Sequence, residues 1–377
     1  MKRLFTLILA LSLCLLCGCG GQGGATEPST VPVAEVTEAP SEIPTEIPTE
    51  VPTEAPTEAP AEVPTEPPVY YNPLTGETLD APVESRIFAV SINNVAPALP
   101  HYGVSKADLY FEMYINDFAV RGLALYADIR EAEAVGSVRS LRYNFTDICQ
   151  AYDAIVVHVG ASDPVMRDLW KTDVPNISVE SEKADYYFRD QERFESGYAW
   201  EHCLFIKGPD IYDYAEEKGI RVTQPRDTAY GLSFTENAVP ADGEPASKVT
   251  INLIHGSAVK PTVMVYDEET GLYTYNQYNR VSYDGHYETD EQFKNVIVMK
   301  CKVNNQMVKS TVYHIAELIG SGEGYFACGG KIIPIRWSRE SDGDTFHFSL
   351  TDGTPLELGV GSTYIAIAPL TSTVEFE

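Results

Sequence analysis

Residues 136–163 (GSVRSLRYNFTDICQAYDAIVVHVGASD) constrain the fold more than any other stretch, because a helix pattern is followed directly by a buried-strand pattern. The helix is predicted by apolar residues at four- and three-residue spacing: Leu141, Phe145, Ile148 and Tyr152. Ser140 precedes them as the expected N-cap. Residues 154–159 (AIVVHV) are almost all apolar and largely β-branched, which is typical of a strand buried on both faces. A helix and a buried strand in succession predict an α/β arrangement.

The turn after this strand gives its one histidine a defined position. Residues 160–162 (GAS) form the predicted turn, Asp163 is the expected N-cap of the next helix, and Pro164 fits the first helical position. His158 then points toward the carboxyl end of its strand, where ligands collect in open α/β sheets. It is either a site residue or a core histidine whose ring nitrogens bond to backbone groups.

Two arginines bracket the first turn of the predicted helix. Arg139 and Arg142 lie where the helix dipole is positive, which is unfavourable by roughly a few tenths of a kcal/mol each. A negative group should therefore compensate them. That group is either an internal carboxylate, such as Asp108 or Glu112, or an anionic ligand bound by the helix N–H groups and the guanidinium groups.

The chain before the helix predicts strands with polar ends. Residues 86–92 form a predicted strand that ends at Asn93 and Asn94. Residues 107–115 alternate between apolar and polar side chains, which favours a strand over a helix. Residues 121–129 would pair with this second strand as a hairpin.

The polar face of the second strand carries Asp108 and Glu112 beside two tyrosines. Together with Arg121 and the asparagines after the first strand, this face is either a structural network or part of the ligand site. Paired carboxylates also serve acid–base chemistry, so Glu112 is a candidate catalytic residue. A second polar cluster, in residues 185–205, is either a solvated face or a site in which His202 acts as acid or base.

Residues 235–377 predict a β-rich domain. Eight short β-prone runs lie between residues 249 and 368, with Asp-Gly turns at 284–285, 342–343 and 352–353. Such a pattern indicates a sandwich or an open barrel. The glycine-rich stretch 320–330 lacks the Lys-Ser/Thr of a phosphate-binding loop and opens no helix, so no nucleotide cofactor is expected. The expected fold is α+β overall, with an N-terminal α/β domain of mixed sheet over 71–230 and the β-rich domain after it.

The first 70 residues predict export and anchoring. Residues 1–19 have a positive start and an apolar run too short for an ordinary membrane span, as in a signal peptide. The run ends in a sequence that resembles the bacterial lipobox, which implies lipid attachment to Cys19 and anchoring rather than spanning. Residues 20–70 are of low complexity, and x-Pro-Thr-Glu repeats within residues 41–67, a composition that cannot bury a core and favours an extended stalk.

Charge and cysteine content exclude several functions. The formal net charge is −28, and the part after the stalk is itself acidic, so no nucleic-acid binding is expected. The cysteines after the stalk form no CxxC or Cys/His pattern, and no metal site is expected: Cys149, Cys203, Cys301 and Cys328. Export permits disulfides between them, and buried free thiols fit the spacing equally well.

Beyond residue 70 the chain resembles the YerB-type lipoproteins of Gram-positive bacteria, a family of unknown function. The resemblance rests on Asn72–Gly76, Gly136–Arg142, His158–Gly160 and His202–Phe205, among other stretches. Ser137 stands where proline is usual in the family, and Cys203 where asparagine is usual. The resemblance implies a lipoprotein with two consecutive domains, attached to the outer face of the cytoplasmic membrane.

Two functional hypotheses from different classes follow. The first is a non-catalytic envelope protein that binds a cell-wall component or a partner protein through Arg139, Arg142 and His158. The second is a hydrolase or transferase acting on wall linkages, with His158 or His202 as acid or base. A solute receptor is a third class, which suits the anchor but not the β-rich second half. No serine elbow, HExxH or catalytic Cys–His signature is present, which favours the binding function.

Overall fold

The computed structural model describes residues 68–116, 119–180, 185–225, 230–253 and 260–377. The predicted signal peptide, the Cys19 attachment site and nearly all of the predicted stalk lie outside these residues.

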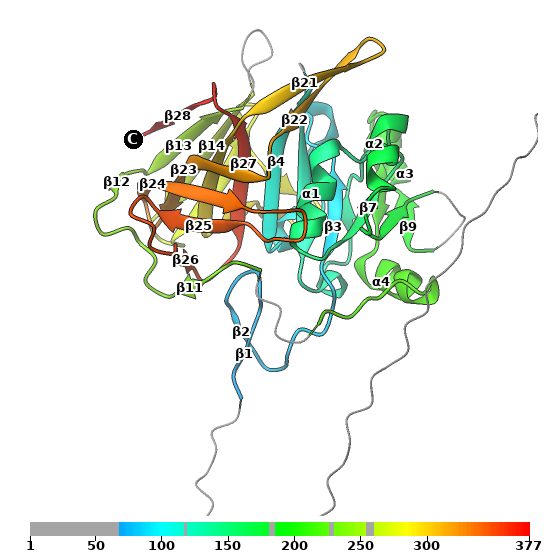
Figure 1. Cartoon of the computed structure of the whole chain (residues 1–377). Helices are drawn as coiled ribbons and strands as arrows, with labels where there is room; N and C mark the ends of the chain where they lie inside the picture. The colour runs from blue at the N-terminus through cyan, green and yellow to red at the C-terminus, as the bar shows by residue number, and fades with distance from the viewer. Residues whose placement is uncertain (1–67, 117–118, 181–184, 226–229, 254–259) are drawn as a thin grey trace, which may run out of the picture. The chain divides into compact units, whose positions relative to one another are not determined.

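An eleven-stranded mixed sheet forms the centre of the fold (Figure 1). Its strand order is β12 (Glu244–Pro245), β24 (Lys331–Arg339), β23 (Gly320–Cys328), β20 (Asn295–Cys301), β27 (Thr363–Pro369), β4 (Leu109–Asn116), β5 (Ala119–Tyr126), β3 (Phe88–Ile92), β7 (Ile155–His158) and β8 (Asn176–Ser178), with β25 (His347–Leu350) paired to β24. Strands from both predicted domains belong to it, because β27 pairs in parallel with β4. The division into 71–230 and 235–377 as separate domains stays a prediction.

A second, six-stranded sheet covers one face of the central sheet. It contains β16 (Arg280–Val281), β15 (Leu272–Gln277), β14 (Pro261–Asp267), β13 (Lys248–Asn252) and β28 (Thr373–Phe376), with β19 (Gln292–Phe293) paired to β15. Tyr110 of β4 shares a buried core with Tyr275 of β15 and Met264 of β14. The region after residue 235 is therefore strand-rich, as expected, and it packs two sheets face to face.

Helices α1 (Tyr143–Ala151) and α2 (Asp163–Leu169) cover the other face of the central sheet. Helix α4 (Gly208–Glu217) packs on the same face as the second sheet, where Ile211 and Ala215 share a core with Phe88 of β3, and the short helix α3 (Gln191–Glu195) follows β9. Figure 1 shows α1 beside β3 and β4. Phe145 and Ile148 of α1 share a second core with Leu109 and Phe111 of β4. The alternation in β4 is confirmed, but both faces of the strand are buried because one faces a sheet and the other a helix.

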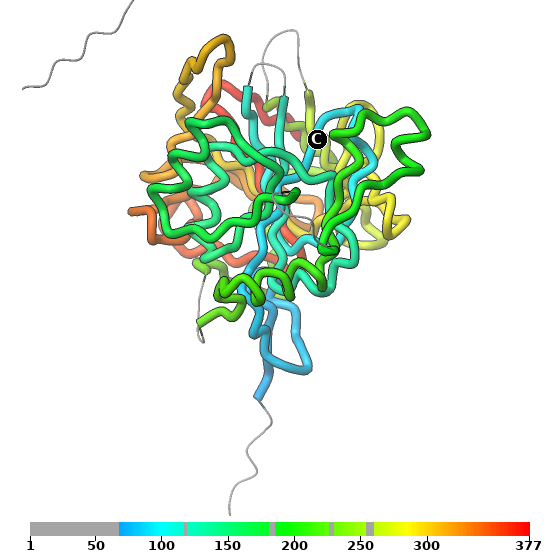
Figure 2. The backbone as a smooth tube through the Cα atoms, turned by 90° about the vertical axis from the view of Figure 1, so that its right-hand side faces the viewer, coloured from blue at the N-terminus to red at the C-terminus, as the bar shows by residue number. Residues whose placement is uncertain are grey.

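Small sheets complete the fold. Their strands are β1 (Tyr70–Tyr71) with β2 (Thr78–Leu79), β6 (Val135–Gly136) with β10 (Leu204–Ile206) and β9 (Tyr187–Arg189), β11 (Phe234–Thr235) with β26 (Leu358–Gly359), β17 (Tyr283–Asp284) with β18 (Thr289–Asp290), and β21 (Val303–Val308) with β22 (Thr311–Ala316). The β1–β2 and β21–β22 hairpins project at opposite ends of the fold (Figures 1 and 2). Tyr114, near the end of β4, stacks on His314 of β22 with ring centroids 4.0 Å apart. The β21–β22 hairpin thus marks the end of the fold at which β4 terminates.

Several predicted boundaries were wrong. Helix α1 begins at Tyr143 with Arg142 as its N-cap, because the backbone before it is extended and bonds to the neighbouring strands. Asp163 is the first residue of α2, and Ser162 is the N-cap. One of the eight β-prone runs predicted after residue 249 covers residues 308–314, and it is interrupted at Lys309, whose positive φ of 56° turns the chain between β21 and β22.

The glycine-rich stretch 320–330 is largely a strand, β23, which the sequence pattern did not predict. A Cβ atom at Gly324 would lie 2.1 Å from the carbonyl oxygen of Val298 on β20. At Gly322 it would lie 2.4 Å from the indole nitrogen of Trp337 on β24. Glycine is needed at these two positions because neighbouring strands and side chains approach the backbone closely.

Candidate functional site

The loop before α1 crosses the carboxyl ends of two central strands. Strands β3 and β7 are parallel, so both end at the same edge of the sheet. The Arg139 N–H donates to the carbonyl oxygen of Ser91 on β3 at 2.8 Å, and the Val159 N–H donates to the Arg139 carbonyl oxygen at 3.1 Å. The Leu141 N–H reaches the Gly160 carbonyl oxygen at 3.0 Å. These bonds hold Arg139 and Arg142 at the edge where open sheets bind ligands.

Arg121 reaches the same edge from β5. This strand is antiparallel to β3 and β4, so its first residues lie where those strands end. Arg121 is directly opposite Met113 of β4, which places its side chain on the face that carries α1. We call Arg121, Arg139 and Arg142 the arginine cluster.

Arg121 is the most unusual member of the arginine cluster. Only 4% of the residue is exposed, and its Nε and Nη1 atoms have no hydrogen-bond partner among the described residues. No described carboxylate lies within 4.0 Å of its guanidinium. Burial lowers the pKa of Arg121 well below its ordinary value, and the positive charges of Arg142 and Arg139 lower it further. A buried cation without a partner is costly, so this group calls for a negative charge from elsewhere.

The other two guanidiniums differ in their partners. Arg139 donates from Nη2 to Oε1 of Glu201 at 2.9 Å, and half of that glutamate side chain is exposed. Within the described ranges, Arg142 bonds to carbonyl oxygens alone, from Nη1 to Leu141 at 2.9 Å and to Ser140 at 3.3 Å. Burial lowers the pKa of Arg142 to about 10. No side chain of the described residues caps the N-terminus of α1, so its first N–H groups add positive potential beside Arg142.

His202 joins this region through Asn93. The Asn93 amide donates from Nδ2 to Nδ1 of His202 at 2.8 Å, so the neutral ring carries its proton on Nε2. Burial lowers the pKa of His202, Glu201 opposes that shift, and Arg139, Arg193 and Arg121 reinforce it. A cavity of about 350 Å³ lies beside His202, lined by Pro97 and residues 196–199. His202 is therefore a neutral hydrogen-bond donor near neutral pH, close to the arginine cluster.

His158 has the geometry of a core histidine. It is fully buried, its Nδ1 lies 2.9 Å from the Gly160 carbonyl oxygen, and its Nε2 lies 3.4 Å from Oδ1 of Asn176. Burial lowers its pKa. The neutral ring has one N–H, and the Gly160 carbonyl oxygen is its closer acceptor, which favours the structural alternative among the two that the sequence left open.

Glu112 and Asn94 belong to a separate buried network between the two large sheets. Glu112 is fully buried and accepts hydrogen bonds from five side chains: Lys260, Thr262 (2.6 Å), Tyr275 (2.9 Å), Tyr364 (2.5 Å) and Asn94 (2.5 Å). The Lys260 ammonium is 4% exposed and forms the ion pair with Glu112. The carboxylate is thus fully used inside the protein and does not compensate the arginine cluster.

Asp108 lies at the opposite end of β4 from the arginine cluster. Its carboxylate accepts the Asn72 amide at 2.8 Å and the Ala127 backbone N–H at 2.6 Å. Burial raises the pKa of Asp108 to about 7, against the lowering effect of these two donors. Neither of the carboxylates considered as internal partners from the sequence therefore meets Arg139 or Arg142.

The raised pKa of Asp108 predicts a pH dependence of stability. The unfolded carboxyl titrates near 3.9, so between pH 4 and 7 the unfolded chain loses its proton first and the stability contributed by this group falls. We expect urea unfolding of Asp108→Asn to lack this loss, which we put at roughly 1–3 kcal/mol for the half-buried group. Equal pH profiles for the variant and the natural chain would contradict the shift. Asp352→Asn, a change in an exposed turn, serves as the control.

The sequence did not reveal two partners that the structure places at these sites. Lys260 pairs with a carboxylate 148 positions earlier, and no local pattern marks it. Glu201 directly precedes the candidate His202, but its pairing with Arg139 spans 62 positions. Both are contacts between distant segments.

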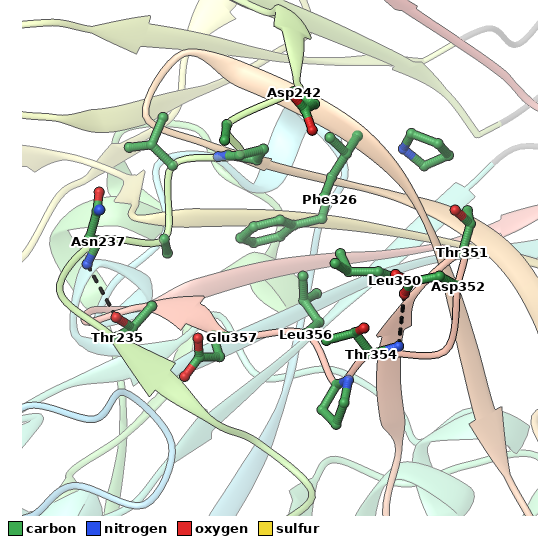
Figure 3. Close-up of a pocket in the computed structure, with 17 residues that line it drawn as sticks. Thr235, Asn237, Asp242, Phe326, Leu350, Thr351, Asp352, Thr354, Leu356 and Glu357 are labelled. Atoms are coloured by element: carbon green, nitrogen blue, oxygen red, sulfur yellow. Dashed lines mark hydrogen bonds between the residues drawn. The ribbon is translucent and has the colours of Figure 1, made fainter.

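Another cavity, of about 540 Å³, lies away from the arginine cluster (Figure 3). Figure 3 shows Phe326, Leu350 and Leu356 lining it, with Asp242 and Asp352 also around it. No predicted site residue lines it.

Other features of the described residues concern cysteine, metal and membrane chemistry. Cys149, Cys203, Cys301 and Cys328 are all buried free thiols. Within the described ranges, no three His, Cys, Asp or Glu side chains gather as a metal site. No helix in the described part of the chain has the length and apolarity to cross a bilayer.

The fold and this edge define a strand-rich protein with few helices, in which three arginines meet where parallel strands end. Two family models match the chain, the N-terminal domain of the "Protein of unknown function (DUF3048)" over residues 74–221 and the DUF3048 C-terminal domain over residues 249–365. The chain belongs to this DUF3048 family, which confirms the resemblance to the YerB-type proteins.

Two comparisons concern YerB itself. The Bacillus subtilis (strain 168) protein named "Putative lipoprotein YerB" is 29% identical over 314 residues, which are 79% of this chain and 86% of that protein. The crystal structure of YerB from Bacillus subtilis superposes with a TM-score of 0.69 at 23% identity, covering 80% of this chain and 98% of that one. The second comparison shows a shared fold.

Proposed function

We propose that this protein is a lipid-anchored protein of the extracytoplasmic envelope that binds an anionic envelope ligand at the arginine cluster. The anchor is proposed on Cys19, and its support is the lipobox-like sequence together with the name of the Bacillus subtilis relative. The ligand is either a wall component or an acidic group of a partner protein.

The observation that carries this proposal is the unpartnered guanidinium of Arg121. Two of its nitrogens have no hydrogen-bond partner within the described part of the chain, and the residue is almost completely buried. Protein interiors rarely leave such groups unpaired, and a bound oxyanion would accept their hydrogen bonds. The uncapped N-terminus of α1 offers further donors in the same region.

The alternative of a hydrolase or transferase has weaker support. His158 is fully buried with Nδ1 against the Gly160 carbonyl oxygen, and Glu112 accepts five side-chain hydrogen bonds in a buried network. Neither is available as an acid or base. His202 remains a donor toward a bound oxygen, a role that fits binding as well as catalysis.

Binding can be tested by calorimetric titration of the full-length protein in detergent with sodium sulfate at low ionic strength. We expect saturable binding that weakens about 10- to 100-fold in Arg121→Met, because a charge-assisted hydrogen bond contributes about 1.5–3 kcal/mol. Arg336→Met, a change at an exposed arginine of β24, is the matched control and should bind as the natural protein does. Absence of saturable binding, or equal weakening in both variants, would contradict the proposal.

A further inference from the structure

The arginine cluster carries more positive charge than the described residues neutralise. Arg139 is paired with Glu201. Arg121 and Arg142 have no described carboxylate within salt-bridge distance. The N-terminus of α1 adds about half a positive charge. At least two positive charges therefore have no counter-charge among the described residues at this end of the sheet.

These charges act on one another. Among neighbouring charges, Arg142 has the largest effect on Arg121, followed by Arg139. Arg142 is the N-cap of α1, and the Arg121 side chain lies on the face of the sheet that carries α1. The unpartnered, buried Arg121 thus points to the same region as the free helix N–H groups, and a single group could accept hydrogen bonds from both.

The charge of the rest of the protein limits what that group can be attached to. The chain has 55 acidic against 27 basic residues, so its surface repels a polymer with a charge on every unit. A single anionic group on an uncharged body meets the local positive charge without that repulsion. A monoanion, such as a carboxylate or a phosphodiester, would leave one positive charge uncompensated.

We propose that the arginine cluster recognises one doubly charged oxyanion of the phosphomonoester class, carried by an otherwise uncharged molecule. This inference rests on the proposed anion-binding function and names the ligand class. His202 would donate from Nε2 to an oxygen beside the charged group, since Asn93 occupies its other ring nitrogen. A phosphomonoester carries nearly two negative charges above a pKa of about 6, whereas a diester carries one.

The test compares small probes of defined charge on the full-length protein in detergent. At pH 8 we expect methyl phosphate and sulfate to bind at least about 10-fold more tightly than dimethyl phosphate and acetate, which corresponds to about 1.4 kcal/mol. Lowering the pH to 5 should weaken methyl phosphate about 10-fold, because the ligand becomes a monoanion.

Sulfate is the internal control for titration of the protein, because it stays doubly charged over this range. The titratable groups around the cluster are Glu201, His202, Tyr110, Tyr143 and Tyr313, and any effect of theirs would change both anions alike. The difference between the two pH profiles therefore reports the charge of the ligand.

The outcomes separate this inference from the proposed function. If dimethyl phosphate or acetate binds as tightly as methyl phosphate, and that binding is lost in Arg121→Met, the anion site stands and the preference for a dianion is wrong. If no anion binds in a manner that depends on Arg121, the proposed function itself fails. If the affinity for methyl phosphate is the same at pH 8 and pH 5, and the affinity for sulfate is also unchanged, the site does not require the doubly charged form. The inference is then overturned.

Discussion

Replacing Lys260 with methionine lowers the free energy of unfolding by about 3–5 kcal/mol, the expected loss when one partner of a buried ion pair is removed. Glu112 would remain fully buried with its charge uncompensated. Burial acts to raise the pKa of Glu112, but Lys260 and the hydroxyl donors outweigh it and the pKa is lowered. Without Lys260 that balance reverses, and the carboxyl must either take up a proton or remain an unpaired buried charge.

The measurement is urea unfolding followed by tyrosine fluorescence at pH 7, with Lys248→Met as the matched control. Lys248 pairs with Glu377 on the surface, where both side chains are largely exposed. A surface pair contributes about 0–1 kcal/mol, so the two lysine variants should differ by at least about 2 kcal/mol. The double variant Lys260→Met/Glu112→Leu should recover part of the loss. Equal stabilities of the two single variants would show that Glu112 is not held by this pair.

Arg121→Met is expected to raise the free energy of unfolding, whereas Lys260→Met lowers it. In the absence of anions, removing a buried guanidinium for which the structure describes no carboxylate partner should raise the free energy of unfolding by about 1–3 kcal/mol. Methionine fills a similar volume with apolar atoms beside Met113. The natural residue would thus lower the stability of the free protein in order to bind an anion.

Adding sulfate should make the natural protein more stable than the Arg121→Met variant. Sulfate at 100 times its Kd would stabilise the natural protein by about 2.7 kcal/mol, and it should stabilise Arg121→Met far less. Thermal unfolding with and without sulfate measures both effects in one series, with Arg336→Met following the natural protein. A variant that is less stable than the natural protein without anions would show that Arg121 already has an internal partner.

Local periodicity explains which parts of the fold were predictable. The β4–β5 hairpin and the buried strand β7 were predicted because alternation and β-branched runs lie within a few consecutive residues. Strand β23 was missed because its glycines resemble a loop in sequence, whereas in the fold they admit the close approach of β20 and Trp337. The residues around these glycines in the sequence do not indicate that β20 and Trp337 pack against them in the fold.

The candidate site could likewise be predicted only where local sequence was sufficient. Arg139 and Arg142 were predicted to bracket the first turn of one helix, but the structure places both before that turn, with Arg142 as the N-cap of α1. Their predicted internal partners were not found, since Asp108 lies at the other end of β4 and Glu112 faces the second sheet. Both facts depend on strand direction and on which sheet covers which face.

The sequence alone determined the elements whose patterns repeat over a few residues: the helix near residue 145, the two-faced burial of β7 and the acidic, strand-rich character of the chain. Only the tertiary structure decided that Arg121 is buried with no carboxylate partner in the described part of the chain and that Glu112 pairs with Lys260. The physical reason is that secondary structure follows from neighbours along the chain, whereas the partner of a charged group follows from the packing of segments more than a hundred residues apart.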